Sequence, residues 1–506
     1  MQKLNDLELL RLSKSRRFLY KFKLFFASIP HAIWALIKKI GSFFKKLGLK
    51  IKELFVFLFE TFRDGSWKTK ISYFLMGFGN ISRKQWVKGL LFFIFEVVFI
   101  LYMIFTGGHW LAKFGTLGNQ NQAVVIDDDL DLAPVNPDNS FKILLYGLLT
   151  LVFIFCFVIT WYMNVKQNAL CDKIEKEGKK IKSNKEDLKS LLDDNFHKTL
   201  LALPVLGVVA FTIIPIIFMI LVAFTNYDGA HNGSTRPFGW VGFENFNALI
   251  NFSSSGSNFS IAFGEILVWT LIWAVFATFT NYFLGMLVAI MINKKGIRGK
   301  KFFRTVLVLT IAVPQFISLL YISNMFADNG LINMFLSKVG LGTIPFWTSP
   351  MLARVMVILI NIWVGIPYLM LITTGILMNI PQDLYESARI DGANSWQQYT
   401  KITLPYMLFV TGPYLLTSFI SNINNFNVIY LLTGGRPNDP RYLVDGNSGG
   451  STDLLITWLY KLTSESAVAN YKLAAVIGIF VFIIVAMISL IVYNLLPSNR
   501  NERDFS

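Results

Sequence analysis

The chain has 506 residues, of which 54% are hydrophobic and only 15% are charged. This composition is too apolar for a soluble protein of this length and excludes that class. The formal net charge of +16 does not indicate a nucleic-acid partner, because most of the excess lies in one N-terminal arm. We therefore expect an all-α protein that crosses a membrane several times.

The arm, residues 1–88, carries 19 of the 47 Lys and Arg residues but only five acids. Within it Phe and Leu alternate with Lys, as in FLYKFKLFF at 18–26, so no stretch is apolar enough to span a bilayer. This pattern predicts one or two helices in the headgroup region of an anionic inner leaflet, with membrane lipids as partners. A partly ordered basic tail is the alternative.

Eight apolar stretches reach the roughly 20 residues that a helix needs to cross the hydrocarbon core. They lie at 89–107, 141–163, 199–225, 265–292, 302–327, 351–378, 406–432 and 472–496. The first two form an N-terminal pair, 89–163, with the acidic outer loop Asp127–Asp131 between them. The other six form a core, 199–498. The charged linker 164–198 that joins the two parts predicts a solvated helix pair.

The positive charges orient these spans. Besides the arm, the linker 164–198 holds nine basic residues and the turn 294–304 holds six, whereas all the loops of the opposite side together hold six. Basic residues accumulate on the cytoplasmic side of membrane proteins. We therefore expect a multi-pass protein of the cell membrane with both termini in the cytoplasm.

Three polar or reactive residues interrupt this plan. Glu96 is an acid inside the first span, and such a residue either has a function or, more often, faces protein or an interface. Cys156 lies in the second span and Cys171 in the linker, a placement that fits neither a disulfide framework nor a metal site. We expect no catalytic residue and no metal.

The loop 379–405, on the cytoplasmic side, has the signals of two short helices. Pro381 suits the first turn of a helix, where its missing N–H has no cost. Gly392 can adopt the left-handed conformation that ends a helix. Asn394 or Ser395 can cap a second helix. The segment therefore predicts a compact helix–turn–helix that protrudes from the membrane.

One face of this loop is suited to docking. Tyr385, Ala388 and Gly392 lie three or four residues apart and are expected to share a face, on which small residues allow close approach. Glu386 is expected to stay exposed as an acceptor for an Arg or Lys of a partner, and Pro405 is expected to end the second helix before the next span. An ordinary amphipathic loop is the alternative.

The spacing E-x-A-x3-G-x9-I-x-L-P in this loop resembles the cytoplasmic coupling loop of bacterial ABC importer permeases, with Ser387 in place of a second alanine. Over about 199–498 the chain is similar to MalF-type subunits of carbohydrate importers. The further similar segments are FTNYDG at 224–229, WVGFENF at 240–246, NIWVGIPY at 361–368, SFISNINNF at 418–426 and STDLLITWLYKLT at 451–463. The resemblance assigns ATPase coupling to Tyr385, Glu386, Ser387, Ala388, Asp391 and Gly392.

The resemblance implies a non-catalytic subunit of an ATP-driven importer. The implied partners are a second, MalG-like permease, two copies of a nucleotide-binding ATPase and an extracellular sugar-binding protein. The chain has no G-x4-G-K-[ST] phosphate loop, so we expect no cofactor of its own and ATP hydrolysis in the partner. The large periplasmic domain of some MalF proteins is absent, and 226–264 is only a Gly/Ser/Asn-rich loop.

Polar residues cluster in the spans 351–378 and 406–432. Asn422 and Asn425 share a helical face with two serines, whereas Asn424 points to another face. The resemblance places the sugar site on these segments, at Asn361, Val364, Gly365, Tyr368, Ser418, Ser421, Asn422 and Asn425. Neutral amides, hydroxyls and an aromatic ring suit a sugar, and no Arg or Lys lies deep in either span to favour an anion. Hydrogen bonding between helices is the alternative.

The expected substrate is a neutral oligosaccharide, with maltodextrins first and galacto-oligosaccharides second. Ser421 replaces a bulky aromatic residue of well-known maltose permeases, which weakens the case for maltose itself. A membrane-embedded enzyme for lipid-linked sugars would need converging acids or a metal cluster, whereas the four His are scattered. A proton-driven secondary transporter would need buried ionisable pairs in the core spans and leaves the Glu386 loop unexplained.

Overall fold

The computed structural model describes residues 14–118, 138–233, 236–250, 259–294, 296–444, 447–465 and 469–495. The acidic run Asp127–Asp131 and the first residues of the arm lie outside these ranges. The chain forms two compact units, which divide near Met219: unit 1 contains the N-terminal part and unit 2 the C-terminal part, with the short segment Gly233–Gly239 also in unit 1. Each unit is described separately.

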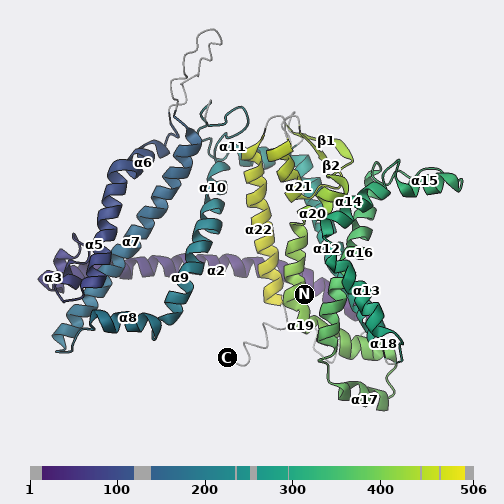
Figure 1. The fold of residues 1–506 in the computed structure, drawn as a ribbon, viewed down its shortest axis with the longest axis horizontal. Helices are drawn as coiled ribbons and strands as arrows, with labels where there is room; N and C mark the ends of the chain where they lie inside the picture. The colour runs from purple at the N-terminus through teal and green to yellow at the C-terminus, as the bar shows by residue number, and fades with distance from the viewer. Residues whose placement is uncertain are drawn as a thin grey trace, which may run out of the picture. The chain divides into compact units, whose positions relative to one another are not determined.

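Unit 1 is helical over most of its described length (Figure 1). Its helices are α2 (Lys14–Asp64), α3 (Trp67–Ile71), α4 (Phe78–Ile81), α5 (Trp86–Tyr102), a π-turn (Met103–Gly107), α6 (Gly108–Phe114), α7 (Ser140–Lys176), α8 (Asn184–Leu192), α9 (Phe196–Val208), a second π-turn (Val209–Ile213) and α10 (Ile214–Val222). Of the two helices predicted for the linker, the first is the continuation of α7 rather than a separate solvated element.

This continuation of α7 is buried against the short helices that precede α5. Arg83 is fully buried, forms a close ion pair with Asp172, and bonds Asn168 Oδ1 at 2.9 Å. Its remaining hydrogen bonds go to Ser66, Thr69, Gly79 and Glu175. Glu96 is also satisfied within unit 1, because its Oε2 accepts the backbone N–H of Met76 at 2.8 Å. In the structure Glu96 therefore connects α5 to the preceding loop, as the structural interpretation of this residue expects.

Helix α2 is one continuous helix, which agrees with the helical prediction for the arm. Several of its apolar side chains are exposed, with Phe43 at 61%, Leu47 at 40%, Phe55 at 65% and Phe59 at 67% of their surface accessible. Lys38 Nζ lies 3.8 Å from the centre of the Trp34 ring. Apolar side chains and interleaved lysines are the two groups that an anionic membrane surface binds.

Unit 2 has a central helix with partners on both sides. It contains α11 (Glu244–Ile250), α12 (Phe259–Asn293), α13 (Lys300–Ala312), α14 (Gln315–Met325), α15 (Leu331–Lys338), α16 (Pro350–Leu377), α17 (Gln382–Ile390), α18 (Ser395–Gln398), a π-turn (Tyr399–Thr403), α19 (Leu404–Ile423), α20 (Phe426–Thr433), β1 (Asn438–Val444), β2 (Asn447–Gly450), α21 (Leu455–Tyr460), a π-turn (Lys461–Glu465) and α22 (Tyr471–Leu495). The long helix α12 packs on α16 and α19. The loop 226–264 includes helix α11, which composition alone did not predict.

Small residues let α12 approach its neighbours. Residues Trp273, Ala277, Asn281, Gly285 and Ala289 follow one another at intervals of four, and the four that carry side chains are buried. A Cβ atom on Gly285 would lie only 2.6 Å from Leu369 Cβ of α16. Close contact through glycine and alanine is the usual way that membrane helices pack, since lipid provides no hydrophobic driving force between them.

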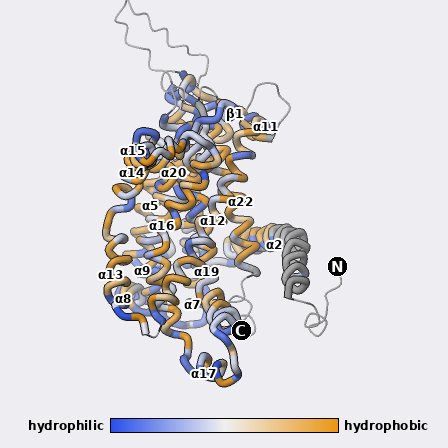
Figure 2. The backbone as a smooth tube through the Cα atoms, turned by 90° about the vertical axis from the view of Figure 1, so that its right-hand side faces the viewer, coloured by the Kyte–Doolittle hydropathy of each residue, from blue (hydrophilic) through white to orange (hydrophobic). Residues whose placement is uncertain are grey.

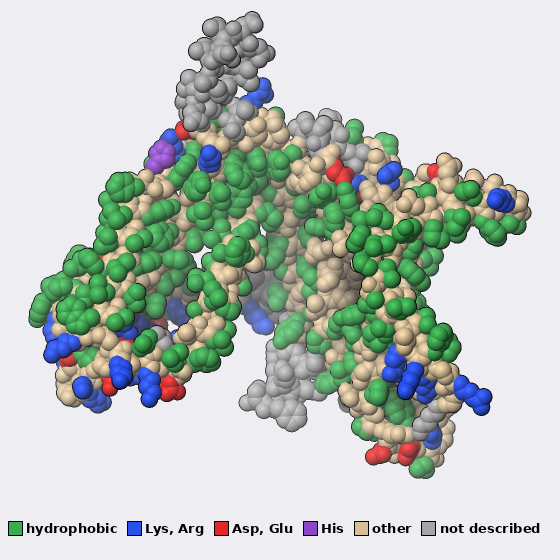
Figure 3. All heavy atoms as spheres, viewed as in Figure 1, with side chains coloured by type: hydrophobic (Ala, Val, Ile, Leu, Met, Phe, Trp, Pro, Cys, Tyr) green, Lys and Arg blue, Asp and Glu red, His purple; other side chains and the backbone are tan. Residues whose placement is uncertain are grey.

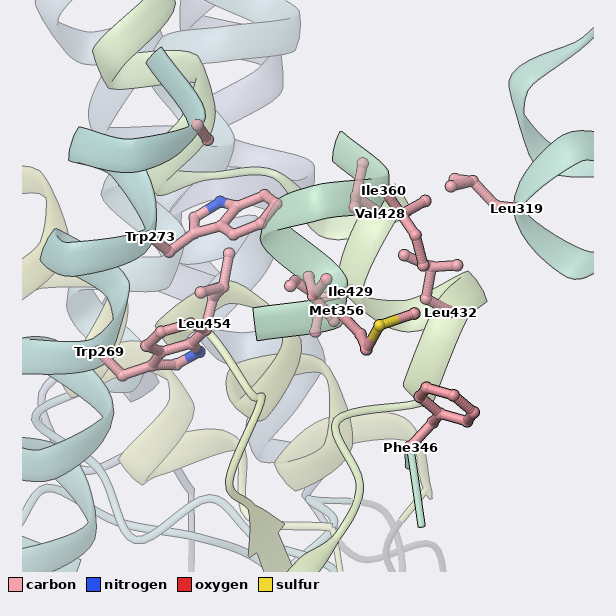
Figure 4. Close-up of a cluster of buried hydrophobic side chains, with 12 residues drawn as sticks. Trp269, Trp273, Leu319, Phe346, Met356, Ile360, Val428, Ile429, Leu432 and Leu454 are labelled. Carbon is pink, nitrogen blue, oxygen red and sulfur yellow. The ribbon is translucent and has the colours of Figure 1, made fainter. Parts of the chain in front are cut away.

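The main apolar core of unit 2 joins α12, α14, α16 and α20 (Figure 4). Trp269 and Trp273 extend from α12 toward Met356 and Ile360 of α16 and toward the apolar side of α20. The cluster consists of Trp269, Trp273, Ala277, Leu319, Phe346, Met356, Val357, Ile360, Val428, Ile429, Leu432 and Leu454. It fixes α20 against α12 and α16, and thereby fixes the point where α20 begins.

Seven described helical segments are long and apolar enough to cross a membrane, and the bent pair α13–α14 brings the total to eight if it is one span. The prediction of eight spans is confirmed in this sense. The predicted span 302–327 bends by 90° between α13 and α14. Pro314 lacks a backbone N–H, and Val313 before it is extended, with φ −78° and ψ 124°. A residue that precedes proline avoids the helical conformation, which explains the break.

The two ends of unit 2 differ in character. Helices α17 and α18 lie at one end, and β1, β2 and α21 lie at the other (Figure 1). Hydrophilic residues are concentrated toward these ends (Figure 2), and Lys and Arg side chains gather near the end that carries α17 and α18 (Figure 3). The basic turn before α13 belongs to this end, since Asn293 Nδ2 bonds Thr374 Oγ1 of α16 at 3.1 Å. The loop 379–405 and the basic turn are therefore on the same side, as charge predicts.

We predict that Arg83→Met destabilises unit 1 by about 3–5 kcal/mol, because the change leaves the buried Asp172 carboxylate without its charged partner. Denaturant unfolding of the purified protein in detergent measures this effect. The matched control is Arg63→Met, which removes the exposed pair with Asp64 and should leave the unfolding midpoint unchanged. Equal midpoints for the two variants would contradict a stabilising role for the buried cluster.

We predict that a peptide of residues 14–64 binds vesicles that contain anionic phospholipid, and that its affinity falls as salt rises. Each basic residue near the surface contributes about 1 kcal/mol through attraction to the lipid charge. A vesicle co-sedimentation series in increasing NaCl measures the effect, with purely zwitterionic vesicles as the control. Binding that is absent or indifferent to salt would exclude the interfacial interpretation of the arm.

Candidate functional site

The most unusual backbone feature of unit 2 is a helix break inside the predicted span 406–432. Helix α19 ends at Ile423 and α20 begins at Phe426, so the span is two helices and not one. Asn425 caps α20, because its Oδ1 accepts the N–H of Val428 at 3.3 Å. Asparagine is a favoured N-cap residue. A break of this kind leaves backbone groups for protein or ligand partners, and such broken helices commonly form the binding sites of transporters.

Polar contacts link the break to helix α12. Asn422 Nδ2 donates to Thr278 Oγ1 at 3.0 Å, and the Asn422 carbonyl accepts from Trp273 Nε1, also at 3.0 Å. Asn425 Nδ2 donates to Asn422 Oδ1 at 3.3 Å, so the two amides share a side, as the spacing predicts. Both side chains are half-buried. These bonds hold helices together, and each amide has further hydrogen-bonding capacity for a ligand.

Asn424 differs from these two residues. Its side chain is exposed and forms a long hydrogen bond of 3.4 Å, from Nδ2 to the carbonyl of Ile420 on its own helix. The prediction that Asn424 faces elsewhere is confirmed. On α19, Ser421 is exposed and Ser418 is half-buried.

Helix α16 carries the other group of predicted sugar-contact residues. Asn361 is 6% exposed and Tyr368 is 52% exposed; Val364 and Gly365 are half-buried. Gly365 has no side chain for a specific reason: a Cβ atom there would lie 2.4 Å from Nδ2 of Asn281 on α12. Of the predicted residues of α16, Gly365 therefore meets α12.

Sequence reasoning missed two residues of this region. Asn281 is 7% exposed and lies against Gly365. The sequence feature that could have identified Asn281 is that it is the single amide residue in the span 265–292. Tyr414 lies close enough to both Tyr368 and Ser418 to interact with them. The sequence feature that could have identified Tyr414 is its position one helical turn before Ser418, on the same face of the helix. The aromatic ring that is absent at Ser421 thus has a counterpart in Tyr414, on the same helix.

The loop 379–405 folds as the sequence predicts at three points. Helix α17 follows Pro381 and ends before Gly392, which has φ +75°. Asn394 caps α18 by accepting the N–H of Gln397 at 2.8 Å, and Gln397 returns a bond to the Asn394 N–H at 2.9 Å. The reciprocal pair is a capping box.

One expectation for this loop is wrong. Pro405 does not end the second helix, because a π-turn at Tyr399–Thr403 joins α18 to α19 without interruption and places Pro405 in the first turn of α19. Tyr385 and Ala388 are half-buried, and the Tyr385 hydroxyl lies 2.8 Å from Thr403 Oγ1. Their contact with a partner stays a prediction.

The outer surface of the loop carries other side chains. Ile390 is 87% exposed and Trp396 is 69% exposed. Glu386 is exposed and lies one helical turn before Ile390. Ser387, Asp391 and Gly392 are exposed too. Large apolar side chains next to an acid form a surface suited to a protein partner with a basic residue. Sequence reasoning concentrated on the small residues and missed Ile390 and Trp396.

The loop and the break are joined by continuous helix. Residues Ser395–Ile423 form one helical stretch of 29 residues, which at about 1.5 Å per residue spans roughly 40 Å. It begins in the loop and ends at the break beside Asn422. On the other side of the loop, α16 ends at Leu377, four residues before Pro381. The two helices that flank the loop are therefore the two that carry the predicted sugar contacts.

A cavity of about 770 Å³ lies at the end of unit 2 that carries β1 and β2. Its wall includes Trp347, Tyr430, Arg436, Lys461 and Glu465. Lys461 also forms a buried ion pair with Asp453 at 2.7 Å. Burial raises the pKa of Asp453, whereas the lysine and the N–H of Gly450 stabilise its charged form. The volume is within the range of about 300–1,000 Å³ for small-molecule sites.

Comparison with known proteins gives consistent results. The family described as "Binding-protein-dependent transport system inner membrane component" matches residues 281–500. The chain is 35% identical over 427 residues to the maltodextrin transport system permease protein MalC of Streptococcus pneumoniae serotype 4, covering 82% of this chain and 93% of that protein. It is 34% identical to the galactooligosaccharides transport system permease protein GanP of Bacillus subtilis over 84% of this chain and 96% of that protein. The Bacillus subtilis maltodextrin permease MdxF is also 34% identical, over 84% of this chain and 94% of that protein.

Proposed function

The chain belongs to the permease family of bacterial carbohydrate ABC importers, and we propose that it forms one half of a path for neutral oligosaccharides, with maltodextrins as the leading substrate. The observation that carries this proposal is the break at Asn424 and Asn425. It places amides on the side of α19 that contacts α12. A galacto-oligosaccharide is the second candidate, because GanP is as similar to this chain as MdxF.

The chemistry of the site supports a neutral ligand. Amides from Asn422 and Asn425, hydroxyls from serines, and the rings of Tyr368 and Tyr414 supply donors, acceptors and flat apolar faces, which are the groups that bind sugars. A charged sugar would call for a basic residue, and the predicted sugar-contact residues include no Lys or Arg. The aromatic pair compensates for Ser421, and this keeps maltodextrins ahead of other sugars.

The continuous helix explains how ATP hydrolysis in a partner can move the site. A force on the loop 379–405 acts on α19 through its unbroken connection to α18, and acts on α16 through the short link before Pro381. Since both helices carry sugar contacts, closing of the ATPases changes the spacing of these contacts. Alternating access then follows as a shift between two arrangements of the bundle.

The proposed assembly has further components. A binding protein on the outside delivers sugar, as the family description implies. A second permease completes the path, and two copies of an ATPase dock on the two loops and supply all nucleotide chemistry. In this chain the docking surface is formed by Glu386, Ile390 and Trp396. The relatives are transport permeases and not enzymes.

We predict that Glu386→Lys lowers sugar uptake and sugar-stimulated ATPase activity by tenfold or more while insertion in the membrane is unchanged. Charge reversal places a positive side chain opposite the Arg or Lys that the partner is expected to present, so the two repel each other. Uptake by proteoliposomes that contain the whole importer measures the effect. Asp328→Lys is the control, because this acid is exposed at the opposite end of unit 2. Normal coupling in Glu386→Lys would falsify the docking assignment.

We also predict that Asn422→Ala and Asn425→Ala each lower the transport of maltotriose, whereas Asn424→Ala has less effect. Loss of one amide that bonds a desolvated hydroxyl costs on the order of 1 kcal/mol or more, or about fivefold in rate. Uptake is compared at equal protein level, with basal ATPase activity as the check that the loop still couples. If Asn424→Ala is the most damaging of the three, the amides of this region serve helix packing and not sugar.

A further inference from the structure

Two buried amides of unit 2 have no hydrogen-bond partner for one of their polar atoms. Within the described residues, Oδ1 of Asn281 on α12 and Nδ2 of Asn361 on α16 are inaccessible and unpaired. Both residues are more than nine-tenths buried. A buried donor or acceptor without a partner costs free energy in the folded state, so native proteins satisfy nearly all such groups. The pair therefore calls for an explanation.

The two amides lie about one helical turn apart along the helix pair. The Asn281 carboxamide lies directly against Gly365. A Cβ atom added to Gly365 would be 2.4, 2.7 and 3.0 Å from Nδ2, Cγ and Oδ1 of Asn281. Asn361 precedes Gly365 by four residues, so it lies one turn away on the same side of α16. Thr278 precedes Asn281 by one turn on α12, and it bonds Asn422 at the helix break. The unpaired atoms are thus next to the proposed sugar contacts.

Packing between helices does not account for these amides. Asn293, on the same helix α12, shows what an asparagine does in that role: its Nδ2 bonds Ala289 O at 2.7 Å and Thr374 at 3.1 Å, and its Oδ1 accepts from Arg304 at 2.8 Å. In the part of the chain that the structure describes, Asn281 and Asn361 form no side-chain hydrogen bond of this kind, although Asn281 lies in a close contact with Gly365 of α16.

The chemistry of the unpaired atoms identifies what would satisfy them. One atom is an acceptor and the other is a donor. A hydroxyl group is the common substrate group that donates and accepts at once. A carboxylate or phosphate oxygen cannot donate to Asn281 Oδ1, and an apolar group satisfies neither atom. A polyhydroxylated ligand such as a sugar therefore fits.

We propose that Asn281 is a specificity-determining sugar contact, whose Oδ1 accepts a hydrogen bond from a substrate hydroxyl while Asn361 Nδ2 donates to the same or an adjacent oxygen. This inference rests on the proposed function. Gly365 takes part by leaving room for the Asn281 carboxamide against α16. Helix α12 thereby contributes directly to recognition, in addition to supporting α16 and α19.

The test uses the assembled importer with its second permease and ATPase, and it measures equilibrium binding of radiolabelled maltotriose in the absence of the binding protein. Asn281→Leu has similar volume and removes the unpaired acceptor. We expect it to weaken maltotriose binding about tenfold and to leave the melting temperature equal or higher. Asn293→Leu is the control: it breaks satisfied bonds, so it should lower the melting temperature and leave binding unchanged.

A second readout separates contact from packing. Deoxy analogues of maltotriose that lack one hydroxyl at a time should bind wild type more weakly at one position, and Asn281→Leu should abolish that difference for this position alone. If the Leu variant does not assemble, Asn281→Ala gives the same comparison. Unchanged maltotriose binding, or equal losses for every analogue in both proteins, overturns the inference.

The same experiment tests the proposed function separately. Wild type that binds neither maltotriose nor a galacto-oligosaccharide contradicts the proposed substrate class, and the inference fails with it. Wild type that binds sugar, with an Asn281→Leu variant that binds equally well, contradicts only the role of Asn281.

Discussion

Unit 2 is organised around the requirement that a chain in hydrocarbon must provide partners for its own polar groups. The break between α19 and α20 is the point where this requirement is hardest to meet. Asn425 meets it on one side by capping α20, and the indole of Trp273 meets it on the other by donating to the carbonyl of Asn422. The apolar cluster around Trp269 and Trp273 then holds α20 in place.

Because α12 provides these partners, it is the element on which the site depends. Its small residues allow α16 to approach, and its Thr278 holds Asn422. The same close approach leaves Asn281 and Asn361 buried without partners for one atom each. A binding site gains from such atoms, since a ligand that satisfies them is favoured over one that does not. The packing of α12 on α16 and the proposed recognition therefore have the same structural origin.

Unit 1 satisfies its polar groups in a different way. Arg83 is buried among hydrogen-bond acceptors at the far end of α7, and Glu96 accepts a backbone N–H. Removing one member of such a cluster is costly, whereas the complete cluster need add little to stability. It fixes the short helices α3 and α4 against α7, and so sets where α2 leaves the unit. The exposed Phe and Leu of α2 have the character that the predicted interfacial role requires.

The sequence by itself determined the features that follow from short-range rules. The eight apolar stretches follow from hydropathy, and the helix–turn–helix of 379–405 follows from Gly392 and Asn394, whose conformations depend on neighbours only a few residues away. It also identified Asn422 and Asn425 as residues of one face, because three residues return the helix nearly to the same direction.

Only the tertiary structure decided which polar groups are paired. The helix break, the half-burial of Tyr385 and the passage of α18 into α19 depend on partners far away in the chain, such as Trp273 and Thr403. The exposed Ile390 and the unpaired Asn281 are equally invisible to local patterns. An amide in a span looks the same in the sequence whether a neighbouring helix satisfies it or not, because only the distance between helices, set here by Gly285 and Gly365, decides that outcome.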